Sequence, residues 1–171
     1  MPCPVFYFPK LIFSPIFARI KHLEFFCMII YGENDLQEKD LADIKKLLDQ
    51  MSTHARPVDL KQIDEVTKHS YIFSARDGEK LVGMGMLAPV FKMMGFFGNV
   101  EDMVVLEDYR GQGVGKKILE KIIEKAKALE MDHLFLTHRQ HRAAAKGLYE
   151  AYGLEEHLAT PYKLYLKKIK I

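Results

Sequence analysis

The sequence predicts an α/β (α+β) protein with one mixed sheet flanked by helices. Three observations lead to this prediction. Apolar residues recur at helical spacing in four segments. Short apolar or alternating stretches stand between them, giving the order β, α, α, β, β, β, α, β, α, β. Finally, 171 residues amount to one ordinary domain, and the chain shows no internal repeat or interdomain linker.

The first half of this domain predicts a strand, two helices and a hairpin. Asp35, followed by Glu38 three residues later, resembles a capping box that opens the first helix, and Asp59 can cap the second. Pro89 is expected to end the second strand of the hairpin. The expected strands are Met28–Tyr31, Ser70–Ala75 and Lys80–Leu87, with the hairpin turn at 76–79.

The second half predicts strands that alternate with helices. Asn99 and the glycines before it are expected in a connection, and Gly153 can end the last helix. The expected elements are a strand at Val100–Leu106, a glycine-rich turn at 110–115, a helix at Lys116–Glu130, a strand at His133–Thr137, a helix at Ala143–Tyr152 and a last strand at Tyr162–Lys168.

Residues 1–27 differ from the rest of the chain. Prolines at positions 2, 4, 9 and 15 break any helix, and charged side chains keep every apolar run well short of the ~20 residues of a membrane span. We expect a dispensable extension, either a poorly ordered appendage or an upstream reading of the gene with Met28 as the start. The domain then covers 28–171. The competing interpretation is that the Phe and Ile side chains of this extension cover the sheet or a partner subunit, which leaves a homodimer open.

Charge and cysteine content exclude several classes of function. The chain has a formal net charge of +2, and residues 1–27 account for all of it. A neutral domain has no general field for gripping nucleic acid, so we expect no nucleic-acid partner. Cys3 and Cys27 cannot build a disulfide scaffold or a four-thiolate zinc site, and we expect no metal.

The strongest signal is the glycine-rich turn between a strand and a helix. Its glycines expose backbone N–H groups that form an anion cradle with the positive end of the helix dipole, and two cations flank it. A P-loop fails here because Arg110 stands at the first glycine and Lys117 at the Ser/Thr position. A dinucleotide fingerprint fails because Lys116 or Ile118 stands at its third glycine. The turn reads Arg110-Gly111-Gln112-Gly113-Val114-Gly115-Lys116.

This turn resembles the pyrophosphate loop of the GNAT superfamily of acetyl-CoA-dependent N-acetyltransferases, Arg/Gln-x-x-Gly-x-Gly/Ala, at every fixed position. Ala145-x-x-Leu148-Tyr149-x-x-x-Gly153-Leu154 is similar to the superfamily's later helix, with Leu154 in place of Phe. The resemblance covers about residues 28–171. It implies the GNAT acyl-CoA N-acyltransferase fold, with six to seven strands and about four helices. It also implies a cytoplasmic enzyme that transfers the acetyl group of acetyl-CoA to the amine of a small molecule or peptide, by direct attack in a ternary complex.

The resemblance also implies roles for individual residues. The backbone of Met103-Val104-Val105 would hold pantetheine and the acetyl carbonyl, with the Val105 N–H as oxyanion donor. Glu101 would be the general base, directly or through water, or else only a charged residue at a solvated strand start. Adjacent strand residues face opposite sides, so Asp102 would satisfy a backbone or loop group. Tyr149 would protonate the departing thiolate, or else be a core aromatic. Arg110 to Lys116 would bind the cofactor's phosphates.

Some features depart from the superfamily or leave the acceptor undefined. Arg142 stands where many members carry Asn, and Thr137 stands where enzymes that acetylate a ribosomal protein carry a glutamate. The stretch 138–142 is read as a basic connection, because no carboxylate or thiol completes a metal set with its histidines. An acyl-CoA-binding module without turnover is the alternative function, and a kinase is disfavoured by both failed motifs. Residues near acceptor-pocket segments are His54, Arg56, His69 and Lys92.

Overall fold

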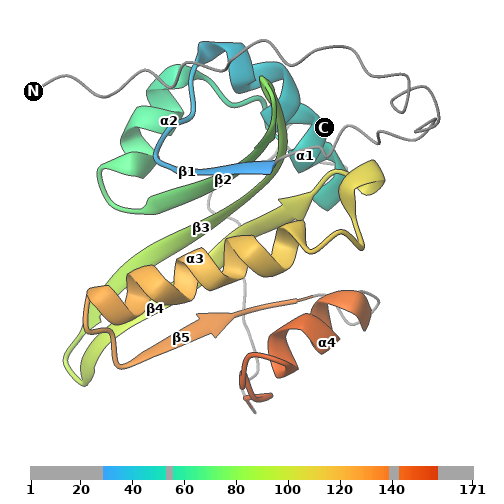
Figure 1. Ribbon diagram of the computed structural model, residues 1–171. Helices are drawn as coiled ribbons and strands as arrows, with labels where there is room; N and C mark the ends of the chain where they lie inside the picture. Colours follow the sequence, from blue (N-terminus) through green and yellow to red (C-terminus); the bar gives the residue numbers. More distant parts are fainter. Residues whose placement is uncertain (1–28, 53–55, 139–142, 158–171) are drawn as a thin grey trace, which may run out of the picture.

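The computed structural model describes residues 29–52, 56–138 and 143–157. One mixed sheet lies at its centre, with helices on both faces (Figure 1). The elements are β1 (Ile29–Glu33), a 3₁₀ turn (Glu38–Asp40), α1 (Leu41–Met51), α2 (Leu60–Thr67), β2 (Tyr71–Asp77), β3 (Lys80–Lys92), β4 (Gly95–Val105), a second 3₁₀ turn (Glu107–Tyr109), α3 (Val114–Ala128), β5 (His133–Leu136) and α4 (Ala143–Glu150).

The described sheet has five strands in the order β1-β2-β3-β4-β5. Neighbours are antiparallel from β1 to β4, whereas β5 runs parallel to β4. The element order confirms the predicted mixed fold, with fewer strands than the six to seven expected. The last expected strand, Tyr162–Lys168, lies outside the described residues, as do residues 1–28.

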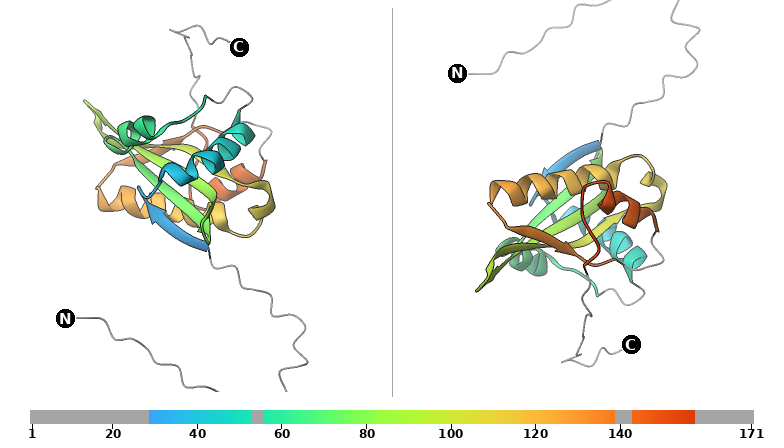
Figure 2. Two further views of the ribbon diagram at one scale, coloured as in Figure 1. Left: turned by 90° about the horizontal axis from the view of Figure 1, so that it is seen from above. Right: turned by 90° about the horizontal axis from the view of Figure 1, so that it is seen from below.

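Two layers of side chains hold the helices to the sheet. Helices α1 and α2 cover one face and α3 covers the other, as the views from above and below show (Figure 2). On the α3 face, Ile118 and Ile122 are fully buried against β2 and β3. Gly85 lets α3 approach the sheet, because a Cβ there would lie 2.8 Å from Ile118 Cγ2. The cluster on the opposite face comprises Ile44, Leu47, Ile63, Leu81, Met84 and Val104.

The structure corrects the expected boundaries of the strands. Strand β3 continues through Pro89, which pairs with Gly98 of β4. Pairing between β2 and β3 ends at Leu87, so Pro89 lies where β3 has a neighbour on one side only and its missing N–H leaves no ladder bond unmade. Strand β4 begins at Gly95 rather than Val100, because Gly98 is a point of close contact and not a loop residue. A Cβ on Gly98 would lie 2.6 Å from a Leu134 methyl carbon.

The expected capping box at Asp35 and Glu38 is wrong. The helical turn begins two residues later, where the backbone N–H of Gln37 donates to Asp40 Oδ2 at 2.7 Å. Asp35 instead accepts a hydrogen bond from Arg76 Nε at 3.2 Å. The Asp59 cap is confirmed, since its side chain accepts from the backbone N–H of Gln62 at 2.8 Å.

Candidate active site

Strand β4 carries a bulge in the middle of the candidate site. Met84 pairs with Val104 and Met86 pairs with Glu101, which leaves Asp102 and Met103 together opposite the single residue Gly85. Asp102 has φ = 49°, in the left-handed region that Asp adopts more readily than most residues. The bulge thus begins one residue before Met103–Val105, the stretch whose backbone the family resemblance assigns to pantetheine and the acetyl carbonyl.

This bulge changes which way the acidic pair faces. Paired residues share a face of the sheet, so Glu101 lies on the same face as Met86, which lines a pocket beneath α1 and α2. Asp102 lines that same pocket. The alternation of a regular strand is interrupted between them, so both carboxylates lie on the α1/α2 face. The expectation that only one of them faces this side is therefore wrong.

Both carboxylates have raised pKa values. Burial raises the pKa of Asp102, although part of the residue remains exposed. Burial also raises the pKa of Glu101, and the neighbouring negative charge of Asp102 adds to this effect. A carboxylate with a raised pKa is a better proton acceptor than an ordinary surface carboxylate, which suits a general base.

The end of β4 presents backbone groups at an edge that β5 does not cover. Strand β5 pairs with β4 only as far as Val100. Beyond Val100, the Leu106 N–H donates to Val82 O of β3 at 2.8 Å. Because successive residues of a strand direct their backbone groups to opposite sides, the N–H and C=O of Val105 point away from β3. Arg110 Nε indeed donates to Val105 O there, at 3.2 Å. The side chain of Val104 belongs to the core, with 8% exposed.

The glycine-rich turn leads from this strand into α3. Gly111 and Gly113 have φ values of 75° and 80°, which favour glycine, and a Cβ on either would meet nothing within 4 Å. Backbone conformation therefore requires glycine at both positions. Gly113 caps α3, which begins at Val114, two residues earlier than the sequence indicated. The first-turn N–H groups of a helix have no partner within it, so this end is suited to an anion.

The polar side chains of the turn have different partners. Besides Val105 O, the Arg110 guanidinium donates to Glu107 at 3.3 Å and to Gln50 of α1 at 3.0 Å. It therefore links the turn to α1 as well as carrying positive charge. Gln112 Nε2 donates to Asp108 O at 2.9 Å and closes the turn. Lys116 is exposed.

Three elements converge at Gly115. A Cβ built there would lie 3.6 Å from Val105 Cγ2 on β4 and 3.9 Å from Leu148 Cδ2 on α4. Tyr149, next to Leu148, is half-buried, and its ring centroid lies 6.1 Å from that of His138. Both sequence motifs and the end of β4 are thus brought together.

The turn after α4 is tied to α3 by Tyr152, whose hydroxyl donates to Glu120 at 2.5 Å. This hydrogen bond raises the pKa of Tyr152 to about 12, with a further contribution from burial. The local sequence around Tyr152 does not predict this contact.

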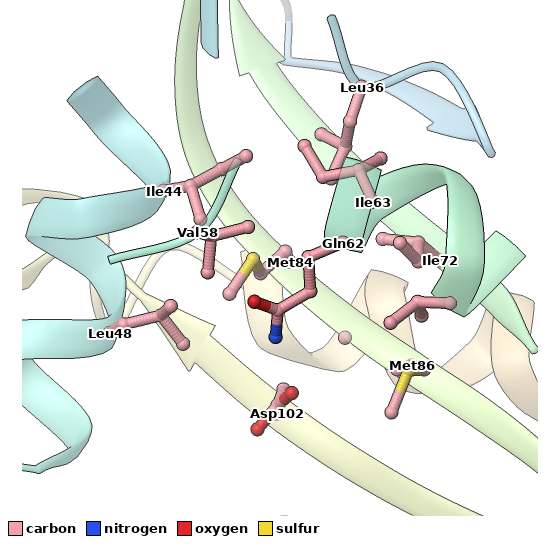
Figure 3. A pocket seen from close by; sticks show the side chains of 12 residues that line it. Leu36, Ile44, Leu48, Val58, Gln62, Ile63, Ile72, Met84, Met86 and Asp102 are labelled. Carbon is pink, nitrogen blue, oxygen red and sulfur yellow. The ribbon is translucent and has the colours of Figure 1, made fainter. Parts of the chain in front are cut away.

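A pocket lies between α1, α2 and the sheet (Figure 3). Its empty space is about 500 Å³, including open solvent. Gln62 of α2 and Asp102 of β4 are its polar side chains, and both point inward in Figure 3. Sequence reasoning missed this pocket because its walls come from segments far apart in the chain. The lining residues are Leu36, Ile44, Leu48, Val58, Gln62, Ile63, Val66, Ile72, Met84, Gly85, Met86 and Asp102.

Of the residues suggested for the acceptor pocket, the three that the structure describes, Arg56, His69 and Lys92, do not line this pocket. His69 is exposed near Glu65, with Nε2 3.6 Å from Oε1. Lys92 lies near the tip of the β3–β4 hairpin, over the Phe97 ring. Arg56 is exposed. The positions 54 and 139–142 lie outside the described residues.

Among the described residues, no group of three or more His, Cys, Asp or Glu side chains is arranged to hold a metal ion. Each helix in this part of the chain is too short or too polar to cross a membrane.

The chain combines a mixed α/β fold with two sequence motifs that meet at Gly115. The model of the acetyltransferase (GNAT) family matches residues 39–154, and the chain belongs to this family.

Solved acetyltransferase structures share the fold. One from Trypanosoma brucei matches with a TM-score of 0.67 at 21% identity, over 81% of this chain and 100% of that one. A glucosamine-6-phosphate N-acetyltransferase from Arabidopsis thaliana matches with a TM-score of 0.66 at 20% identity, over 81% and 99%. An aminoglycoside acetyltransferase from an uncultured soil metagenomic sample matches with a TM-score of 0.67 at 17% identity, over 80% and 96%.

Proposed function

We propose that this protein is an N-acetyltransferase that moves the acetyl group of acetyl-CoA to a primary amine by direct attack in a ternary complex. The observation that carries this proposal is the convergence at Gly115 of the end of β4, the first turn of α3 and α4. The end of β4 supplies the backbone N–H of Val105 as a donor, the first turn of α3 supplies the anion cradle, and α4 supplies the phenol of Tyr149. Two carboxylates with raised pKa values lie on the adjoining face.

The turn before α3 fits the pyrophosphate of acetyl-CoA. Left-handed glycines expose backbone N–H groups, the helix dipole favours negative charge, and Lys116 adds an exposed cation. Val114 is 1% exposed, so its side chain is core and only its backbone is available to a ligand. The residues proposed to hold the cofactor are Met103, Val104, Val105, Arg110, Gly111, Gln112, Gly113, Val114, Gly115 and Lys116.

In the proposed reaction, Glu101 accepts a proton from the amine, directly or through water. The freed nitrogen lone pair then forms the new C–N bond at the acetyl carbonyl. The Val105 N–H donates to the carbonyl oxygen as negative charge develops on it. The carbonyl re-forms as the C–S bond breaks, the electron pair leaves with sulfur, and Tyr149 donates a proton to that thiolate. The nitrogen of the new amide releases its second proton to water, and the Tyr149 phenolate regains a proton from solvent.

The proposal is tested by incubating the protein with acetyl-CoA and a library of primary amines, and measuring release of free CoA. Amine-dependent release supports the transferase. Tight binding of acetyl-CoA without release for any amine supports the alternative, an acyl-CoA-binding module. Failure to bind acetyl-CoA contradicts both.

Glu101→Gln is expected to lower turnover by about 10²–10⁴-fold, with the largest effect at low pH. Free amine is scarce there, whereas near the amine's own pKa of ~10.4 a base is hardly needed. The measurement is kcat from pH 6 to 10. Glu124→Gln, an exposed carboxylate on α3, is the matched control and should follow the parent. A Glu101→Gln profile equal to the parent's rules out this base.

Tyr149→Phe is expected to lower kcat at least tenfold while the acetyl-CoA affinity stays within about twofold. The reason is that the hydroxyl acts on the departing thiolate and not on the bound ground state. Tyr152→Phe, in the turn that follows the same helix, is the control. This substitution breaks the contact with Glu120, so it should lower the melting temperature and have little effect on kcat. Equal kcat values for Tyr149→Phe and the parent would exclude the acid role.

A further inference from the structure

The pocket beneath α1 and α2 has mainly apolar walls. Aliphatic and thioether side chains surround it on three sides (Figure 3). Those that matter most are Ile44 and Leu48 of α1, Ile63 and Val66 of α2, and Met84 and Met86 of β3. Such walls favour a hydrocarbon group, since removing apolar surface from water is favourable.

Few polar groups face this space. Of its described lining residues, only Asp102 carries a charge, and Gln62 contributes one amide. Among these described residues phosphate would find no cation and would face a carboxylate. The several hydroxyls of a sugar would need more hydrogen-bond partners than one amide and one carboxylate supply, and each unpaired hydroxyl would weaken binding.

Asp102 lacks a counter-charge. Within the described ranges its carboxylate makes no hydrogen bond or ion pair, and the neighbouring Glu101 adds negative charge. Burial raises the pKa of Asp102, which means that its charged form is disfavoured. An incoming ammonium would pair with the carboxylate and favour the charged form again. Asp102 remains exposed, so an ammonium can reach its carboxylate from solvent.

The position of Asp102 also suits an acceptor. It stands three residues before Val105 on the same strand, a span of at most about 10 Å. A primary amine held at Asp102 is thus close to the proposed oxyanion donor, with its hydrocarbon body beneath α1 and α2.

Resting on the proposed function, we infer that the acceptor is a primary amine with a compact hydrocarbon body. The apolar walls hold that body, and Asp102 pairs with the ammonium before Glu101 removes a proton. Amino-sugar phosphates and aminoglycosides are poor acceptors.

Phenethylamine and 2-phenylethanol, which differ in the amine, are the probes for binding. By calorimetry, phenethylamine should bind the parent at least tenfold more tightly than 2-phenylethanol. Asp102→Asn should remove this preference while leaving 2-phenylethanol unchanged. Asn also tolerates the left-handed conformation, so the bulge should persist. Asp64→Asn, on the exposed side of α2, is the control for net charge and should keep the preference.

A second variant guards against misfolding of the first. Met86→Lys places an ammonium beside Asp102 and should weaken phenethylamine binding at least tenfold. The inference is overturned if Asp102→Asn and Met86→Lys both bind phenethylamine as the parent does. It is equally overturned if glucosamine 6-phosphate or an aminoglycoside is acetylated faster than phenethylamine.

Binding and turnover separate the two proposals. Release of CoA with polar amines, together with no binding of phenethylamine, upholds the transferase and overturns the acceptor class. Asp102-dependent binding of phenethylamine without CoA release from any amine upholds the pocket and overturns the transferase.

Discussion

Gly113→Glu is expected to abolish acetyl-CoA binding, whereas Gly113→Ala is expected to retain most of it. At φ = 80° both substitutions carry the same left-handed strain, about 1–2 kcal/mol of stability. Neither adds a clash, because a Cβ at Gly113 meets nothing within 4 Å. The difference in affinity between the two variants therefore reports the added carboxylate alone, placed where the pyrophosphate is proposed to lie.

Calorimetric titration with acetyl-CoA, beside thermal melting of both variants, checks this expectation. The melting temperatures should agree with each other and lie a few degrees below the parent's. An affinity of Gly113→Glu within threefold of the parent's would place the phosphates elsewhere. Equal loss in both variants would mean that the loop conformation, and not its charge, limits binding.

Local patterns in the sequence predict the elements that this site needs. Helix α3 follows from the spacing of Ile118, Leu119 and Ile122, all of which are fully buried. The glycine-rich turn was placed correctly because left-handed positions such as Gly111 and Gly113 strongly select glycine. That the two motifs meet at Gly115 is a tertiary contact that neither motif alone predicts.

Contacts between distant segments could not be read from local patterns. The facing of Glu101 and Asp102 depends on a bulge, which arises from the pairing of β4 with β3 across Gly85. Pro89 predicted a strand end because proline is poorly tolerated inside a sheet. It is tolerated here because β2 stops pairing with β3 at Leu87, and the local sequence does not show where that pairing ends. The pocket could not be predicted because it exists only once α1 and α2 lie over the sheet.

Arg76→Met is expected to lower the free energy of unfolding by about 3–5 kcal/mol at pH 7. Asp40 is 1% exposed, and Arg76 holds it with two hydrogen bonds, Nη1 to Oδ1 at 2.7 Å and Nη2 to Oδ2 at 2.8 Å. Methionine keeps the aliphatic part of the side chain but leaves a buried carboxylate without its cation. Asp40 immediately precedes α1 and closes the 3₁₀ turn before it by accepting from the Gln37 N–H, so the substitution also loosens a wall of the pocket.

The pH dependence of the free energy of unfolding shows whether loss of the buried ion pair causes this destabilisation. Burial alone would raise the pKa of Asp40, but the hydrogen bonds from Arg76 and from the Gln37 backbone outweigh it and hold the pKa below its ordinary value. In the parent this carboxylate therefore contributes stability that is present above the ordinary pKa of about 3.9 and is lost as the pH falls through the lowered one.

In Arg76→Met the carboxylate loses that stabilisation and burial raises its pKa, so protonation relieves the buried charge. The deficit relative to the parent should therefore be largest at pH 7. It should begin to shrink above pH 4, as the carboxylate of the variant takes up a proton, and continue to shrink below about pH 4, as that of the parent does. Urea unfolding at pH 7, 5 and 3.5 measures this difference. The double variant Asp40→Leu with Arg76→Met removes both charges and should be more stable than Arg76→Met alone. A deficit that stays constant with pH, or a double variant less stable than the single one, would show that packing of the arginine stem and not the buried ion pair holds α1 to β2.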